Sequence, residues 1–140
     1  MRRGVFFNLI FIGAGLLYIL IPVIFPVCTS HGGSVMKCHW TARAETGLGA
    51  VLIMGGLLYC LAKNEARRLD LSQMIGVLAI LGGALPTLLI GVCANEAMLC
   101  RAGTLPAWTL LSGFLLAISV LDIRRLSKKI SRDPEEGACA

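Results

Sequence analysis

Charge is scarce in this chain of 140 residues. Only 15% of its residues are charged and 56% are hydrophobic, whereas a water-soluble domain carries roughly a quarter charged residues. The charges are also clustered, which leaves apolar runs close to the length of about 20 residues that one bilayer crossing requires. A soluble domain is therefore excluded. The basic excess flanks the apolar runs, so it does not indicate nucleic-acid binding.

The sequence also lacks the common catalytic motifs. It has no nucleotide-binding loop, no catalytic-triad pattern, no paired-carboxylate site and no C-x-x-C pair. Acidic and basic residues stand towards the ends of the apolar runs, with Glu45 near Arg43 and Asp122 near Arg124. We expect these side chains at the membrane interfaces. No acidic or basic residue falls near the midplane of any of the expected helices, which argues against a proton-coupled pump or an ion channel.

Four apolar runs predict an all-α, polytopic membrane protein with four transmembrane helices. The first run is longer than the core of a signal peptide, which is about 7–15 residues, and no small-x-small cleavage site follows it. We therefore expect it to be retained as a helix. The runs cover residues 4–27, 44–62, 74–92 and 106–123.

The basic residues predict the orientation of the chain. If the amino terminus lies inside, only Lys37, Arg43 and Arg101, of the 13 Lys and Arg residues, lie outside. The positive-inside rule then predicts a multi-pass plasma-membrane protein with cytoplasmic termini and two cysteine-bearing outer loops. We expect residues 1–129 to form the transmembrane domain and residues 130–140 a disordered cytoplasmic tail.

The two halves of the chain share features in the same order. A Met-x-Cys pattern occurs in each polar loop, ending at Cys38 and at Cys100, and Arg-Arg-Leu follows both the second and the fourth apolar run. This order predicts a tandem duplication, with hairpins of about residues 1–70 and 71–129 related as parallel repeats.

Four cysteines fall in the loops expected outside: Cys28, Cys38, Cys93 and Cys100. An even number of cysteines facing an oxidising compartment usually forms disulfides. Pairing Cys28 with Cys38 and Cys93 with Cys100 respects the repeat and gives a disulfide-stabilised outer cap. The two other connectivities would join the hairpins to each other.

An alternative hypothesis is catalytic. Four helices with a cysteine pair in each outer loop resemble the bacterial membrane oxidoreductases that generate disulfides and pass electrons to quinone. Such an enzyme needs two pairs that exchange electrons in relay. Nine and six residues separate the paired cysteines here, which departs from the C-x-x-C spacing.

A further alternative is a metal or haem site in the first outer loop. Met36, His39 and His31 are candidate ligands, and the thiolate of Cys38 would complete a set suited to copper or zinc. A disulfide at Cys38 would remove that thiolate, so this hypothesis competes with the predicted bridges.

Glycines are frequent in the second apolar run. Gly49 and Gly56 fall within about 20° of the same helix face. Small residues let helices approach closely in lipid, so we expect one glycine face to pack inside the bundle and another to meet a partner helix. The candidate partner-binding residues are Gly49, Gly56 and Trp40.

Three motifs carry a resemblance to a known family: the proline-then-cysteine end of the first run, the M-K-C-H-W-T sequence from Met36 to Thr41, and the C-x6-C second loop. They resemble a family of small bacterial four-helix membrane proteins, domain of unknown function family 4418, from about Phe7 to Leu126. Members often accompany ABC-type exporters. The resemblance implies a non-catalytic accessory or binding subunit of a membrane assembly, with an ABC-type permease as partner, and it supplies no established catalytic residues to carry over to this chain.

Overall fold

The computed structural model describes residues 2–25, 37–91 and 100–132. The long helices are α1 (Arg2–Ile24), α2 (Lys37–Leu61), α3 (Glu65–Ala84) and α4 (Leu105–Ile130), and two π-helical turns are η1 (Leu85–Leu89) and η2 (Cys100–Thr104). Four segments built on these helices are long and apolar enough to cross a membrane. The prediction of an all-α, multi-pass membrane protein is confirmed.

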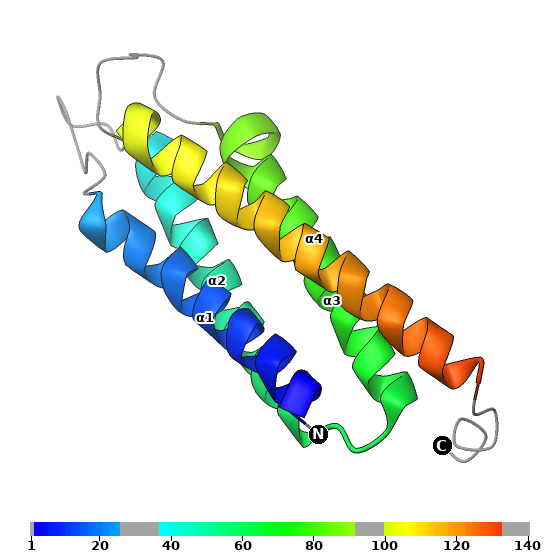
Figure 1. Ribbon diagram of the computed structural model, residues 1–140. Coiled ribbons are helices and arrows are strands. Elements are labelled where there is room, and N and C mark those ends of the chain that lie inside the picture. Colours follow the sequence, from blue (N-terminus) through cyan, green and yellow to red (C-terminus); the bar gives the residue numbers. More distant parts are fainter. Residues whose placement is uncertain (1, 26–36, 92–99, 133–140) are drawn as a thin grey trace, which may run out of the picture.

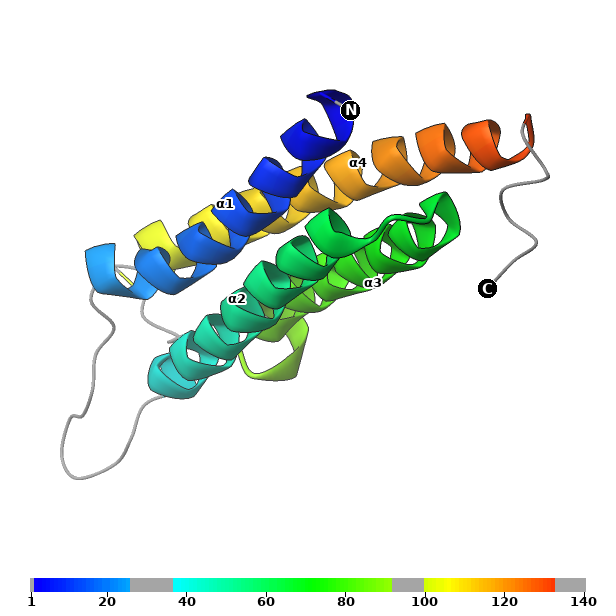
Figure 2. The ribbon, with the colours of Figure 1, turned by 90° about the horizontal axis from the view of Figure 1, so that it is seen from below.

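The helices run alternately up and down as two hairpins (Figure 1). Helices α1 and α2 pack along each other, as do α3 and α4. Seen from below, α1 and α4 form one layer and α2 and α3 the other (Figure 2). The start of α1, the α2–α3 connection and the end of α4 lie at one end of the bundle, called here the terminal end. The opposite end is called the loop end.

The helices extend beyond the apolar runs into charged sequence. Helix α3 begins inside the charged segment that follows α2, where the Asn64 side chain accepts a hydrogen bond from the backbone N–H of Ala66 at 3.4 Å. This N-cap satisfies one of the free donors of the first turn. Helix α4 likewise continues through the basic residues to Ile130, with Lys128 and Lys129 in its last turn. Cations there interact favourably with the helix dipole.

Helix α3 ends in a widened turn caused by Pro86, which has no backbone N–H to donate. The backbone N–H groups of Ile90 and Gly91 both donate to the carbonyl oxygen of Leu85, at 3.0 and 3.3 Å. Gly91 then takes a φ of 80°, which a side chain would disfavour. Its carbonyl accepts a hydrogen bond from the Thr41 hydroxyl at 2.8 Å, which ties the start of α2 to the end of α3.

Helices α1 and α2 touch backbone to backbone at two glycines. A Cβ atom added to Gly49 would lie 2.7 Å from the carbonyl oxygen of Gly15, and one added to Gly15 would lie 2.8 Å from that of Gly49. Farther along α2, a Cβ on Gly56 would lie 2.7 Å from Cγ1 of Ile12. These glycines form the internal packing face. Gly49 and Gly56 were expected to contact a partner helix outside the bundle. Helix α1 covers both glycines, so they cannot do so.

The centre of the bundle is apolar. The fully buried side chains there come from all four helices, and they separate the polar groups found nearer the two ends. They are Phe11, Leu52, Ile75, Ala79 and Leu115. Gly76 faces α4, where a Cβ would lie 3.6 Å from Cβ of Ser119, an ordinary van der Waals contact.

We predict that Gly49→Ala destabilises the protein and that Gly47→Ala does not. The added methyl at Gly49 meets backbone, which cannot rotate away, and overpacking of this kind costs about 1–3 kcal/mol. At Gly47 nothing lies within 4 Å of an added Cβ. Thermal unfolding of both variants in the same detergent checks this. Equal midpoints for the two would contradict the close contact between α1 and α2.

Candidate functional site

Buried polar contacts join the two hairpins. Near the loop end, the hydroxyl of Tyr18 on α1 and the hydroxyl of Ser112 on α4 are 2.5 Å apart, and both residues are buried. The Ser112 hydroxyl also donates to the carbonyl oxygen of Trp108 at 2.7 Å. Gly82 of α3 makes room for Tyr18, since a Cβ there would lie 2.5 Å from the tyrosine oxygen. This contact fixes α1 against both helices of the second hairpin.

A second contact crosses the bundle nearer the terminal end. The Tyr59 hydroxyl on α2 donates to Oδ2 of Asp122 on α4 at 2.8 Å, and Asp122 is fully buried. Ser72 of α3 lies alongside and donates to the carbonyl oxygen of Ser119 at 3.5 Å. Hydrogen bonds between helices of this kind strengthen a bundle in lipid. The hydrogen bond from Tyr59 also offsets part of the desolvation free energy of the buried Asp122 side chain.

Glu45 is the most unusual residue of the interior. It is 0% exposed, and neither carboxylate oxygen has a hydrogen-bond partner among the described residues. It stands eight residues after Lys37, about 12 Å along α2 from its start. The Tyr18 side chain lies close enough for electrostatic interaction with it. Ionisable side chains inside a membrane span are functional candidates, so Glu45 is a candidate that the sequence reasoning missed.

The positions of Glu45 and Asp122 correct the sequence analysis. Both were expected at the membrane interfaces beside arginines, but both are fully buried inside the bundle, while Arg43 and Arg124 are exposed.

The burial of Glu45 and Asp122 could have been predicted from the helical spacing of the buried positions. The buried positions of α2 run from Thr41 through Glu45, Gly49 and Leu52 in steps of three or four. Glu45 is thus one turn before the glycine already assigned to the packing face. The buried positions of α4 follow the same rule and include Asp122: Trp108, Ser112, Leu115, Ser119, Asp122 and Leu126.

Most of the candidate ligands and bridge residues lie outside the part that the structure describes. These are Cys28, Cys93, His31 and Met36, together with the side chain of Cys100. Within residues 2–25, 37–91 and 100–132, no three His, Cys, Asp or Glu side chains are grouped to hold a metal ion. The metal and haem hypotheses therefore stay predictions.

Three residues predicted to act at the loop end are described, and all lie in the first turn of α2. Cys38 is 2% exposed and its sulfur is bonded rather than a free thiol. The rings of His39 and Trp40 meet edge to face, with centroids 6.2 Å apart. Trp40 is 57% exposed, which is compatible with a place in an interfacial aromatic belt.

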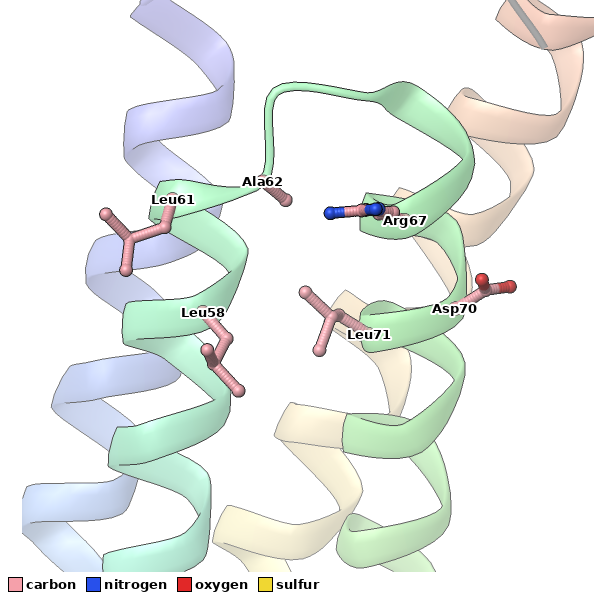
Figure 3. A pocket seen from close by; sticks show the side chains of 6 residues that line it. All are labelled: Leu58, Leu61, Ala62, Arg67, Asp70 and Leu71. Atoms are coloured by element: carbon pink, nitrogen blue, oxygen red, sulfur yellow. The ribbon is translucent and has the colours of Figure 1, made fainter. Parts of the chain in front are cut away.

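Two cavities flank the α2–α3 connection at the terminal end. One is a groove of about 340 Å³ between α2 and α3, in which Leu58 and Leu71 face each other and Arg67 extends towards Ala62 (Figure 3). The other is a larger cavity of about 540 Å³, called here the terminal pocket. All four helices line it, and its polar lining consists of Asn8, Tyr59, Lys63, Glu65, Arg68 and Lys129.

The fold and its interior define a four-helix membrane protein with buried polar contacts. The family described as Domain of unknown function (DUF4418) matches residues 7–124, which is more than half of the chain. The chain belongs to this family, as its loop motifs led us to expect. No curated protein and no solved structure matches the chain.

We predict a coupling between Tyr59 and Asp122 of about 1 kcal/mol. Tyr59→Phe should lower the free energy of unfolding, because it leaves a buried carboxyl oxygen without its donor. In an Asp122→Leu background the same change should cost much less. A double-mutant cycle by detergent unfolding measures this. Effects that add without coupling would contradict the contact. Glu45→Met, which removes a carboxyl group that makes no hydrogen bond to any described residue, serves as the control and should cause no loss of stability.

Proposed function

We propose that this chain is a non-catalytic accessory subunit of a larger bacterial membrane assembly, with an ABC-type permease as the expected class of partner. One observation carries the proposal: a smooth strip on the outward face of α4. Gly113 is exposed and nothing lies within 4 Å of a Cβ added to it, and Ala117, one turn later, is also exposed. Small residues four apart allow a second helix to approach closely in lipid.

The strip has the shape expected of a helix-binding face. The bulky neighbours Leu110 and Phe114 are 74% and 54% exposed, so they project from the surface of α4 beside the two small residues. Small residues also allow close helix packing inside the bundle, where glycines bring α1 and α2 into backbone contact. A partner helix on α4 would use the same packing that holds the first hairpin together.

We predict that Gly113→Leu abolishes co-purification of partner subunits in mild detergent while the protein stays folded. The added side chain enters open space, so it blocks the strip without disturbing the bundle. Gly47→Leu is the matched control, because Gly47 is equally open but lies on α2. Loss of partners in both variants, or in neither, would contradict a specific partner face on α4.

We further propose that both termini are cytoplasmic, and that Cys28–Cys38 and Cys93–Cys100 form bridges in an outer cap. The bonded state of Cys38 supports a structural role for the first pair. The tandem relation of the two hairpins belongs to the same proposal, since each bridge would then close one repeat. A short bridge of this kind contributes roughly 2–3 kcal/mol in the entropic model.

Non-reducing peptide mapping should find Cys28 joined to Cys38 and Cys93 joined to Cys100. An impermeant thiol reagent applied to intact cells after reduction should label Cys28, Cys93 and Cys100 and should not label Cys139, whereas the buried Cys38 should react more slowly than these three. A bridge between Cys28 and Cys93 would overturn the predicted connectivity, and labelling of Cys139 would overturn the orientation. Mixed disulfides trapped with a soluble partner would instead support the thiol oxidoreductase hypothesis.

A further inference from the structure

The terminal pocket has the size and the position of a ligand site. Its volume of about 540 Å³ lies within the range of roughly 300–1,000 Å³ that is usual for small-molecule sites. It lies at the end of the bundle where the two hairpins diverge, beside the α2–α3 connection (Figure 1). The same end carries the basic residues that the charge asymmetry predicts to be cytoplasmic.

The charges that line the terminal pocket favour an anion. Three cations, Lys63, Arg68 and Lys129, stand against one carboxylate, Glu65. Glu65 is already paired with Lys129. The remaining two cations have no ion-pair partner within the described part of the chain. The Tyr59 hydroxyl is already donated to Asp122, so it is not available to a ligand.

Arg68 is held in place before any ligand arrives. Its Nε donates to the carbonyl oxygen of Ala62 at 2.9 Å, and its guanidinium carbon lies 5.7 Å from the centre of the Tyr59 ring. One donor and one face of the guanidinium are thus used by the protein. The terminal nitrogens remain for a planar, bidentate contact of the kind that arginine makes with phosphate.

Asn8 supplies a second and independent feature. It is 8% exposed, it lines the terminal pocket, and its Oδ1 has no hydrogen-bond partner among the described residues. A buried acceptor without a donor is costly. A hydroxyl carried by the headgroup of a lipid would donate to this oxygen and satisfy it.

The surroundings of the terminal pocket are those of a lipid. Val5 and Cys60, both exposed, belong to its lining. The outer faces of the two flanking helices present apolar side chains, with Leu9 63% and Leu61 75% exposed. An amphiphile can therefore place its polar group among the cations and leave its acyl chains against the helices. Basic pockets between helices at the cytoplasmic side are a recurrent mode of lipid recognition.

We propose that the terminal pocket binds the headgroup of an anionic phospholipid, with the phosphate held by Lys63 and Arg68 and a headgroup hydroxyl donating to Asn8. This site is independent of the partner face on α4. It would anchor the terminal end of the bundle in one leaflet and hold the diverging hairpins at a fixed separation.

Native mass spectrometry of the full chain with added phosphatidylglycerol or phosphatidylcholine of equal acyl length tests the proposal. Phosphatidylglycerol should bind more tightly than phosphatidylcholine. Lys63→Gln should weaken its binding about fivefold, the loss expected from one cation near a membrane surface. Arg67→Gln is the matched control: it removes the same charge four positions along the chain, but Arg67 lines the other groove, so binding should not change.

Two further experiments test whether the bound phosphate belongs to a lipid and whether the Asn8 side chain contacts the headgroup. Asn8→Leu should reduce the preference for phosphatidylglycerol over phosphatidic acid, which lacks the headgroup hydroxyl. Millimolar inorganic phosphate should not displace the lipid, and displacement that depends on Lys63 would assign the site to a soluble phosphate instead. Equal losses in Lys63→Gln and Arg67→Gln, or equal binding of both lipids, would overturn the proposal. Unfolding midpoints measured without lipid confirm that each variant is folded.

Discussion

Helices in lipid gain no hydrophobic force by meeting each other, and the rest of this structure follows from that constraint. The chain uses two substitutes. Within the first hairpin, Gly15 and Gly49 bring two backbones into contact. Between the hairpins, the Tyr18–Ser112 and Tyr59–Asp122 contacts supply polar attraction that lipid cannot offer. Close packing therefore builds the hairpins, and buried hydrogen bonds join them.

This division places polar groups near both ends of the bundle and leaves an apolar layer between them. At the loop end, Tyr18 and Ser112 lie on the same side of that layer as the carboxyl group of Glu45, which has no hydrogen-bond partner in the described part of the chain. At the terminal end, Tyr59, which donates to Asp122, lines a basic cavity. The two ends are thus chemically different: the buried acidic group nearer the terminal end accepts a hydrogen bond and lies beside a cavity that gathers cations, whereas the one at the loop end has no hydrogen-bond partner among the described residues.

The four membrane-spanning helices could be predicted from the sequence, but which of their side chains face the interior of the bundle could not. Apolar run length and charge asymmetry predict four crossings, because both reflect the bilayer and not the neighbouring helices. Which glycines face inwards depends on where α1 lies, so Gly49 and Gly56 were assigned to an outside partner although α1 covers them. Glu45 was placed at an interface from its distance to the end of the apolar run, while its position on the buried stripe was not considered. Asn64 and Pro86 set the two limits of α3 through local chemistry that propensity arguments can anticipate.

The claim that small residues set the helices in register can be tested with one engineered bridge. A Cβ on Gly76 would lie 3.6 Å from Cβ of Ser119, within the separation of about 3.5–4.5 Å that a disulfide spans. The measurement is mass-spectrometric detection of this bridge in a Gly76→Cys, Ser119→Cys variant under mild oxidation, beside a Gly76→Cys, Gly113→Cys control. The account predicts a bridge in the first variant and none in the control, because Gly113 faces outwards. A bridge in the control, or its absence from the first variant, would contradict the packing of α3 on α4.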